Sequence, residues 1–282
     1  MNITTMLKSI LSASGWSQET LAGRLGVSFV TLNSWVNGRS EPRRKAAESI
    51  QLLYFEIVGT DEVDTEQLVA AKAEVTRRKI RVQAITRDQA VLDRLTLHLT
   101  YHTNSIEGST MTLSDTEEAL FNDKVLTNRT QVEQLEARNH QAALLWLLNE
   151  MNAKDFRLTE DTVLGLHTRL MNGILSDAGR YRRHSVRIMG AQVTVANYLK
   201  VPQLVVELMD GQAGSIADTI TNLATSHAAF EKIHPFSDGN GRVGRLLMLS
   251  QALIAGVTPP LVLRERRKAY YRLRNSAMRK TG

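Results

Sequence analysis

Apolar residues recur at spacings of three and four along most of the chain, and this period limits the possible folds more than any other feature. Such spacing puts the apolar side chains on one face of an α-helix. Residues 114–117 have the spacing of a capping box and predict the start of one helix. Further helical patterns cover approximately residues 130–151, 160–174, 202–210, 216–233 and 242–255. We therefore expect an all-α fold.

Residues 186–195 depart from this pattern. Their side chains alternate in character on either side of Gly190. A period of two around a glycine predicts a small β-hairpin. We expect it to be the one β element in an otherwise helical chain.

The chain of 282 residues is longer than one ordinary compact domain, and its composition changes along its length. Short helical patterns broken by glycine and proline fill residues 3–55, and a polar, charged stretch follows at 56–87. We predict a small N-terminal domain at 1–58, a connecting segment at 59–88 and a larger helical domain at 89–282.

Charge is distributed unevenly: residues 1–55 carry a net +3, residues 56–263 a net −4 and residues 264–282 a net +7. A basic N-terminal domain fits a nucleic-acid partner. The basic C-terminal stretch fits one too, but such a run is more common on the solvated face of a terminal helix. The sequence has no cysteine, no apolar run long enough to cross a bilayer and no signal peptide. We expect a cytoplasmic protein without disulfides, thiolate metal sites or membrane contact.

A loop at residues 234–242 separates two of the predicted helices. Pro235 disfavours the helical conformation for the residue before it, so the first helix should end at His234. Gly239 and Gly241 leave the backbone free to point N–H groups at a ligand. The loop therefore has the features of a ligand-binding turn.

Arg242 and Arg245 stand three residues apart, in what we expect to be the first turn of the second helix. Helix N-termini carry partial positive charge, so two cations there are unfavourable unless an anion lies between them. Together with the glycine-flanked amides they predict a cradle for a polyphosphate. Asp238 suits a Mg²⁺ ion that bridges phosphates, and His234 can accept a proton from an attacking hydroxyl near neutral pH.

Residues 234–245 match, at every specified position, the motif His-Pro-Phe-x-Asp/Glu-Gly-Asn-Gly-Arg-x-x-Arg, and the chain therefore resembles Fic-domain proteins. The resemblance extends over about residues 90–275, because the sequence at 179–182 followed by the predicted hairpin is similar to the substrate-docking flap of that family. It implies a helical core with one hairpin, ATP and Mg²⁺ as cofactors, and transfer of AMP to a Ser, Thr or Tyr hydroxyl of a target protein.

Carried over by position, the resemblance implies His234 as the general base, Asp238 as the Mg²⁺ ligand and Arg245 as the γ-phosphate contact. Relatives that phosphorylate carry Lys in place of Gly241, which favours AMP transfer here. The implied ATP-binding residues are Asp238, Gly239, Asn240, Gly241, Arg242 and Arg245, of which Asn240, Gly241 and Arg242 contact the α- and β-phosphates. The implied flap residues are Val186, Arg187, Ile188, Met189 and Gly190.

An amphipathic helix is predicted at about 89–108, where Gly108 has the place of a C-terminal cap. Glu107 then lies at the negative end of its helix, where an acid is disfavoured. Such local conflicts tend to mark functional sites, although an exposed Glu near a loop is an equally simple interpretation.

The pattern Thr103-x-x-x-Glu107-Gly108 resembles the inhibitory-helix motif, Ser/Thr-x-x-x-Glu-Gly/Asn, of some Fic proteins. The resemblance implies that Glu107 pairs with Arg245, blocks the γ-phosphate position and holds ATP in an unproductive pose. Some relatives also use this Glu to activate water and remove AMP, which the sequence leaves open.

In the N-terminal domain Ser17 opens a short helix, Gly26 makes a turn and Ser28 caps a second helix. Two closely crossing helices of this kind resemble the helix-turn-helix of Cro and the phage repressors over about residues 5–55. The resemblance implies DNA phosphate contacts through Gln18, Ser28, Asn37 and Arg39, and major-groove contacts through Phe29, Val30, Thr31, Asn33 and Ser34. Because Phe29 and Val30 are apolar, readout would depend on thymine methyls or be weak. A helix-turn-helix also serves in protein interactions.

Three functions remain open from the sequence. The first is an autoinhibited AMP transferase with a DNA-binding domain. The second is a transcription regulator whose Fic domain is a sensor or the dimerisation unit of a homodimer, and the intact motif argues against it. The third is an AMP-removing enzyme in which Glu107 acts as a base. We favour the first.

Overall fold

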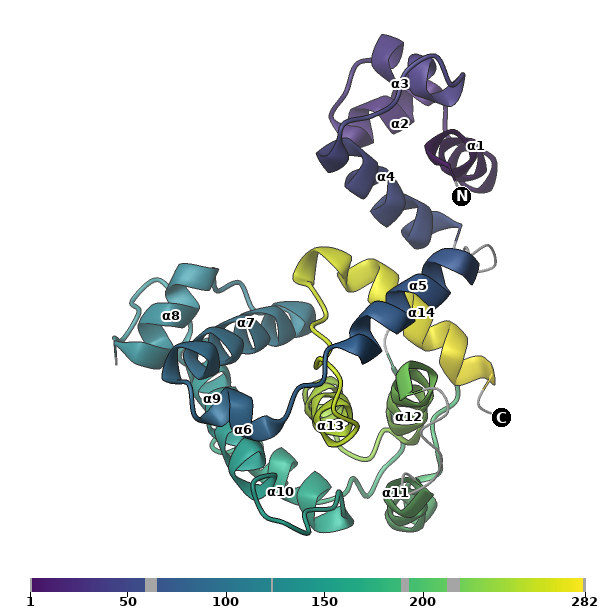
Figure 1. The fold of residues 1–282 in the computed structure, drawn as a ribbon. Coiled ribbons are helices and arrows are strands. Elements are labelled where there is room, and N and C mark those ends of the chain that lie inside the picture. Colours follow the sequence, from purple (N-terminus) through teal and green to yellow (C-terminus); the bar gives the residue numbers. More distant parts are fainter. Residues whose placement is uncertain (1, 59–64, 123, 189–192, 212–218, 281–282) are drawn as a thin grey trace. The chain divides into compact units, whose positions relative to one another are not determined.

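The computed structural model describes residues 2–58, 65–122, 124–188, 193–211 and 219–280. The chain divides into two compact units, one of Met1–Ala71 with Glu265–Arg274 and one of Lys72–Arg264 with Asn275–Gly282. The described residues form helices joined by loops and contain no strand (Figure 1), so the predicted all-α class is confirmed. Within the same residues no helix combines the length and the hydropathy needed to cross a bilayer.

The N-terminal unit begins with four helices: α1 (Ile3–Ser14), α2 (Gln18–Leu25), α3 (Phe29–Val36) and α4 (Arg44–Ile57). The hydroxyls of Ser17 and Ser28 cap α2 and α3 by accepting N–H groups of the first turn, and Gly26 ends α2 with a left-handed φ of 66°. These caps confirm the predicted helix boundaries. The buried core between the four helices contains Leu7, Ile10, Leu21, Leu32, Trp35, Ile50 and Tyr54.

The rest of the chain is also helical. Its helices are α5 (Thr65–Arg77), α6 (Val82–Thr86), α7 (Gln89–Glu107), α8 (Leu113–Phe121), α9 (Gln131–Glu150), α10 (Glu160–Leu170), α11 (Val201–Asp210), α12 (Thr219–Ile233), α13 (Asn240–Ile254) and α14 (Arg267–Lys280), with short 3₁₀ turns at Tyr198–Lys200 and Arg264–Arg266.

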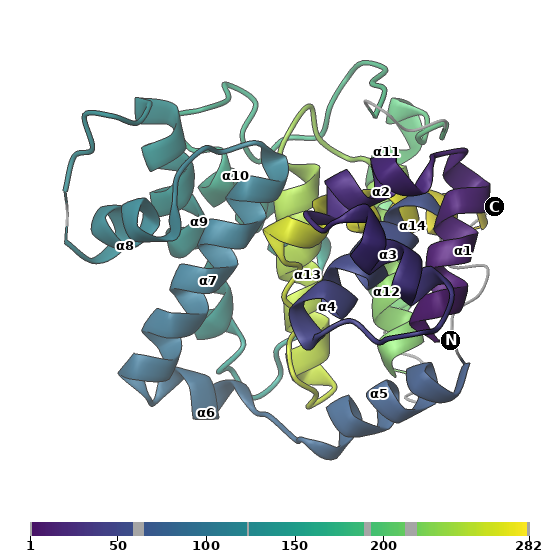
Figure 2. The same ribbon diagram turned by 90° about the horizontal axis from the view of Figure 1, so that it is seen from above.

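Helix α13 is the centre of the larger unit. It packs along α12 and also contacts α7, α9 and α10 (Figure 2). Buried residues around it include Leu144, Leu147, Leu166, Phe230, Phe236, Val243, Leu246 and Leu249. Because α13 is enclosed on several sides, side chains from three other helices can reach its first turns.

The predicted β-hairpin is not seen. Residues 186–188 and 193–195 form no strand, and residues 189–192, its expected tip, lie outside the described part of the chain. A two-stranded hairpin with no further strand to pair with is only marginally stable. The ends of this segment make other contacts instead: the carbonyls of His184 and Ala196 accept hydrogen bonds from Arg182, and the Ala196 N–H donates to Lys232 O.

Helix α8 begins earlier than the predicted capping box at 114–117. Its N-cap is Thr112, whose hydroxyl accepts the Asp115 N–H at 3.1 Å. The Asp115 carboxylate accepts the Thr112 N–H at 2.9 Å in return. The reciprocal pair satisfies two backbone donors at once, and this places the helix start two residues before Ser114.

Glu133 fixes the chain that follows the end of α7. Its Oε1 accepts hydrogen bonds from the Thr110 N–H at 2.6 Å and the Thr110 hydroxyl at 2.8 Å. Its Oε2 accepts the Thr130 hydroxyl at 2.8 Å and so completes the cap of α9. Burial opposes ionisation, but these hydrogen bonds outweigh it and lower the pKa of Glu133 from 4.5 to about 2. The carboxylate therefore joins α9 to the segment just after α7.

We predict that Glu133→Gln lowers the free energy of unfolding of the larger unit by about 1 kcal/mol at pH 7, the usual cost of a lost cap. The folded-state pKa lies below the unfolded value, so the carboxylate stabilises the fold above pH 4.5 and loses this effect as the pH falls toward 2. Calorimetry of both proteins between pH 7 and pH 3 should show the difference shrinking below pH 4.5.

The exposed Glu117 on α8 offers a control, because Glu117→Gln should leave the transition unchanged at every pH. A difference between the parent and Glu133→Gln that stays constant with pH would contradict the assigned role.

Candidate active site

The loop between α12 and α13 begins with a strained residue. Helix α12 ends at Ile233, as Pro235 predicts, and His234 has a left-handed φ of 51°. The His234 ring nitrogen Nδ1 lies 3.2 Å from Glu231 O. Because a carbonyl only accepts, Nδ1 is the protonated nitrogen and the basic lone pair is on Nε2.

The side chain of Asn240 is hydrogen-bonded to the backbone of this loop. Its side-chain oxygen accepts the Phe236 N–H at 2.9 Å, and its side-chain NH₂ donates to Phe236 O at 2.9 Å. The residue is buried. The sequence predicted a phosphate contact through Asn240. Because its side chain is engaged with the loop backbone, the backbone N–H is the group that Asn240 can offer to a ligand.

His167 on α10 supports the other side of the loop. Its ring stacks on Phe236 with centroids 3.7 Å apart and planes 5° apart. Nδ1 accepts the Gly179 N–H at 2.8 Å, and Nε2–H donates to Asp238 O at 3.1 Å. Burial lowers the pKa of His167 from 6.5 to about 4. The ring is therefore neutral near pH 7, and it holds the backbone at Asp238 in place.

The start of α13 has no side-chain cap. Gly239 is the N-cap residue, with a φ of 78°, and Asn240 is the first helical residue. Arg242 lies in the first turn, but Arg245 lies in the second, one turn later than the sequence analysis placed it. Side chains on a helix lean toward its N-terminus, so the Arg245 guanidinium still reaches Gly241.

Both arginines are almost fully buried, with 3% of the Arg242 side chain and 8% of the Arg245 side chain exposed. Arg242 Nη1 lies 2.7 Å from Glu136 Oε1 on α9, and Arg245 Nη2 lies 2.6 Å from Glu107 Oε1 on α7. Two buried cations at the positive end of a helix are costly unless anions offset them. The two carboxylates supply that compensation.

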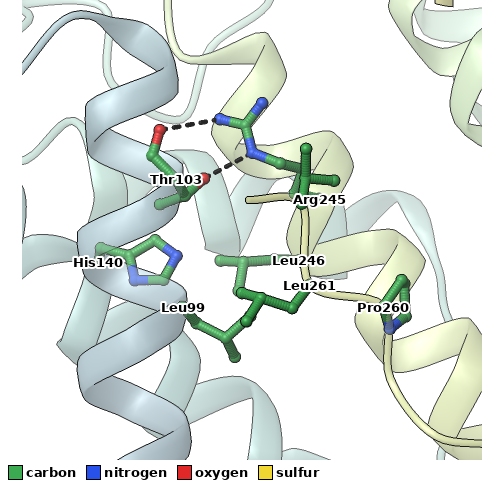
Figure 3. A pocket seen from close by; sticks show the side chains of 8 residues that line it. Leu99, Thr103, His140, Arg245, Leu246, Pro260 and Leu261 are labelled. Carbon is green, nitrogen blue, oxygen red and sulfur yellow. Dashed lines mark hydrogen bonds between the residues drawn. The ribbon is translucent and has the colours of Figure 1, made fainter. Parts of the chain in front are cut away.

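Thr103 completes the contact between α7 and α13. Its hydroxyl accepts a hydrogen bond of 2.6 Å from Arg245 Nε, and its carbonyl accepts a longer one of 3.4 Å from Arg245 Nη2. Figure 3 shows the arginine directed at both oxygens. The guanidinium is therefore held in one orientation by the last turns of α7.

Glu107 lies directly against the first turn of α13. A Cβ atom added at Gly241 would collide with Glu107 Oε1 and come within 3.0 Å of Arg245 Nη1. Glycine at 241 is thus required for this close approach. The Glu107 carboxylate, whose side chain is 30% exposed, takes the place where a helix N-terminus binds an anion.

A small pocket lies beside the Arg245–Thr103 contact (Figure 3). Its lining residues are Leu99, Thr103, His140, Arg245, Leu246, Pro260, Leu261 and Val262. His140 Nδ1 lies 2.8 Å from the Thr100 hydroxyl. Burial, and then the charges of Arg245 and Arg242, lower the pKa of His140 from 6.5 to about 3. This histidine is therefore neutral near pH 7 and adds no further charge to the arginines.

The structure brings most of the predicted catalytic residues together around one loop. His234, Asp238, Gly239, Gly241, Arg242, Arg245 and Glu107 all lie at or against the α12–α13 connection. The Asp238 carboxylate is 66% exposed and lies 3.6 Å from Arg242 Nη2. Of the predicted flap residues, Val186, Arg187 and Ile188 are described, whereas Met189 and Gly190 lie outside the described residues.

The predicted DNA-contacting residues lie in the N-terminal unit, on and around α3. Several of them bond to one another: Asn33 donates to Gln18 Oε1 at 3.1 Å, and Asn37 donates to Asn33 O at 2.8 Å. The Ser34 and Ser40 hydroxyls lie 2.7 Å apart. Phe29 and Val30 are exposed at the start of α3. The group forms a polar surface with two apolar side chains at one edge.

Sequence reasoning gave no role to four residues that hold this site: Thr103, Glu136, His167 and Arg182. Thr103 was visible as the first position of the inhibitory-helix motif. The other three lie 52 to 106 residues from their loop partners, and no spacing in the sequence marks such contacts.

Comparison with known families matches residues 157–252 to the Fic/DOC family and residues 7–52 to a helix-turn-helix family. The chain is 31% identical over 186 residues to the protein adenylyltransferase Fic of Nematostella vectensis, a match that covers 63% of this chain and 42% of that protein. It is 31% identical over 175 residues to the protein adenylyltransferase fic-1 of Caenorhabditis elegans, covering 61% of this chain and 34% of that protein. The chain thus spans less than half the length of these curated relatives.

The fold is similar to the crystal structure of a Fic family protein from Desulfovibrio desulfuricans, with a TM-score of 0.60 and 26% identity. The similarity covers 78% of this chain and 68% of that one. The predicted resemblances to Fic-domain and helix-turn-helix proteins are therefore confirmed.

We predict that Thr103→Val lowers the free energy of unfolding of the larger unit by about 1–3 kcal/mol, because it leaves a buried charged donor, Arg245 Nε, without its acceptor. Thr96 on the same helix is the matched control. Its hydroxyl is buried and has no hydrogen-bond partner among the described residues, so Thr96→Val should be neutral or stabilising. Urea unfolding of the two variants measures this contrast, and equal effects would show that the Thr103 hydroxyl contributes nothing specific.

Proposed function

The chain contains a Fic domain behind an N-terminal helix-turn-helix domain, and from this premise we propose that it transfers AMP from ATP to a hydroxyl group of a target protein. One observation carries the proposal: two buried arginines, Arg242 and Arg245, converge on the uncapped N-terminus of α13 next to His234. That arrangement is suited to a polyphosphate held beside a base.

The phosphates would bind at the first turn of α13. Asn240 and Gly241 contribute backbone N–H groups there, because the first N–H groups of a helix have no partner within it. The N–H of Gly239 donates to Asp238 Oδ1 at 2.6 Å and holds that carboxylate beside the cradle. Arg242 and Arg245 contribute guanidinium groups, which match phosphate geometry. This set requires no rearrangement of the Asn240 side chain, which stays on Phe236.

A Mg²⁺ ion would be held by Asp238. Its carboxylate is exposed beside the cradle, and the part of the chain that the structure describes contains no cluster of three or more potential ligands. A single carboxylate is sufficient for Mg²⁺, which takes its other ligands from phosphates and water. Bound there, the ion would neutralise phosphate charge.

Transfer would use the lone pair of His234. The hydroxyl oxygen of the target bonds to the α-phosphorus while its proton moves to Nε2 of His234. The bond from the α-phosphorus to the bridging oxygen breaks, and pyrophosphate leaves with that oxygen. The Nδ1–H bond to Glu231 O keeps the ring in the tautomer that can accept the proton. The segment Val186–Ile188 is the part of the described chain that we assign to docking the target.

Glu107 would control the reaction by competing with ATP. Its carboxylate and the γ-phosphate need the same partner, Arg245, and the same space over Gly241. A charge-assisted hydrogen bond contributes about 1.5–3 kcal/mol, which is sufficient to change the population of an ATP pose by about tenfold or more. In this proposal, the state in which Glu107 pairs with Arg245 is the inhibited one.

For the N-terminal domain we propose duplex DNA as the partner. The domain carries a net +3 charge over residues 1–55, and α3 exposes Phe29 and Val30 next to the Ser34 hydroxyl. Exposed apolar side chains at the start of a recognition helix suit the methyl groups of thymine.

We predict that Glu107→Gly raises label transfer from α-labelled ATP to protein by about tenfold or more, because Arg245 is released for the γ-phosphate. The matched control is Glu150→Gly, the same substitution at the exposed last residue of α9, which should change nothing. Incorporation is measured on gels with α-labelled and γ-labelled ATP in parallel.

The same experiment separates the alternatives. His234→Ala in the Glu107→Gly background should abolish transfer, since loss of a general base costs about 10²–10⁴-fold. Label from γ-labelled ATP would mean phosphorylation instead. No label from either nucleotide, with or without Glu107, would contradict the proposal and favour a sensor role.

We predict that the full chain binds duplex DNA with an affinity that falls steeply with salt, as counterion release requires. Arg39→Ala should weaken binding to all sequences and reduce the salt slope by about 1, whereas Ser34→Ala should change the preference at one base position. Fluorescence anisotropy with a randomised and a selected duplex measures both. A chain that binds no duplex even at low salt would favour a protein partner for this domain.

A further inference from the structure

Arg182 is a buried cation whose guanidinium donates hydrogen bonds to backbone carbonyls. Only 2% of it is exposed, and within the described residues its recorded hydrogen bonds all go to carbonyl oxygens. No recorded ion pair of that part of the chain includes it. Burial lowers the pKa of the guanidinium from its ordinary value. A charge kept at this cost points to a role beyond packing.

Three consecutive carbonyls of the catalytic loop accept from this one residue. Arg182 Nε donates to His234 O at 2.7 Å, and Nη2 donates to Ile233 O at 3.3 Å. The backbone N–H of Arg182 donates to Pro235 O at 3.0 Å. The backbone on both sides of the catalytic histidine is therefore fixed by a single partner.

The end of α12 explains why a cation fits here. The last carbonyls of a helix have no N–H partner within it and carry partial negative charge. His234, with its φ of 51°, turns the chain out of the helix and presents its own carbonyl to Arg182. The guanidinium thus caps α12, and the carbonyl dipoles offset its buried charge.

The same guanidinium also holds the chain on either side of the docking segment, at His184 and Ala196. Nη1 donates to His184 O at 2.8 Å, and Nη2 donates to Ala196 O at 2.6 Å. Ala196 is fixed a second time, because its N–H donates to Lys232 O at 3.1 Å. Arg182 therefore holds both the backbone of His234 and the residues on either side of the docking segment.

We propose that Arg182 is a positioning residue for AMP transfer, which holds His234 in its left-handed conformation and anchors the chain at His184 and Ala196, on either side of the docking segment. The inference rests on the proposed function. Arg182 contacts no reacting group and acts through the backbone. A planar fork with five donors can hold four carbonyls in different directions, which the three donors of a lysine on a flexible stem cannot.

Arg182→Lys in the Glu107→Gly background tests this. Lysine keeps the positive charge but lacks the planar guanidinium with its five donors. The rate of AMP transfer should therefore fall by about tenfold to a hundredfold, the usual effect of a misplaced catalytic group. The Kd for ATP should stay the same, because Arg182 makes no recorded contact with α13. Arg169→Lys is the matched control, since Arg169 also donates to a backbone carbonyl of this unit, Gly165 O at 3.0 Å, and its change should leave the rate unchanged.

A second readout does not depend on activity. The ¹⁵N spectrum of the His234 ring, assigned with His234→Ala, should report the Nδ1–H tautomer in the parent and a mixture in Arg182→Lys. If the Glu107→Gly protein transfers no AMP, the proposed function fails while this measurement still decides the positioning role. The inference would be overturned if Arg182→Lys left both the transfer rate and the His234 tautomer as they are in the Glu107→Gly protein. Thermal unfolding shows whether the variant is folded, and Arg182→Lys is preferred to Arg182→Met because it keeps the buried charge.

Discussion

Two guanidinium groups buried at the positive end of one helix are the constraint on which the larger unit depends. Arg242 and Arg245 cannot be buried at the start of α13 unless negative charge comes to them. Glu136 on α9 and Glu107 on α7 supply it. The packing of α7 and α9 against α13 therefore depends on these two ion pairs. The glycine at 241 is part of the same arrangement, since a side chain there would exclude Glu107.

This compensation matters for the function that we propose, in which a phosphate of ATP would replace one of the two carboxylates as the partner of its arginine. The two arginines differ in this respect. Glu107 is the last residue of its helix and is partly exposed, whereas Glu136 lies within α9. The Glu107 contact is therefore the one that can open with little disturbance to the fold, and the hydrogen bonds of Glu133 to Thr110 just after α7 limit how far that end can move.

Sequence patterns predicted where several helices begin and end, but they misplaced one capping box and predicted a hairpin that is not seen. The end of α12 just before His234, the Gly108 cap of α7 and the caps of α2 and α3 were all predicted, because each depends on residues adjacent in the chain. The capping box of α8 was placed two residues late, since several Ser, Thr and acidic residues nearby have compatible spacing. The β-hairpin was wrong for the described residues, because alternation alone does not provide a partner for the backbone.

The sequence by itself determined the helical class and the resemblances to Fic-domain and helix-turn-helix proteins, because these follow from spacing and residue type within a short stretch. Only the tertiary structure decided which carboxylate faces which arginine, that the Asn240 side chain serves the loop, and that Arg182 holds the carbonyls around His234. Those contacts join residues far apart in the chain. Their geometry is set by how α7, α9, α10 and α12 pack around α13, and no local pattern records that packing.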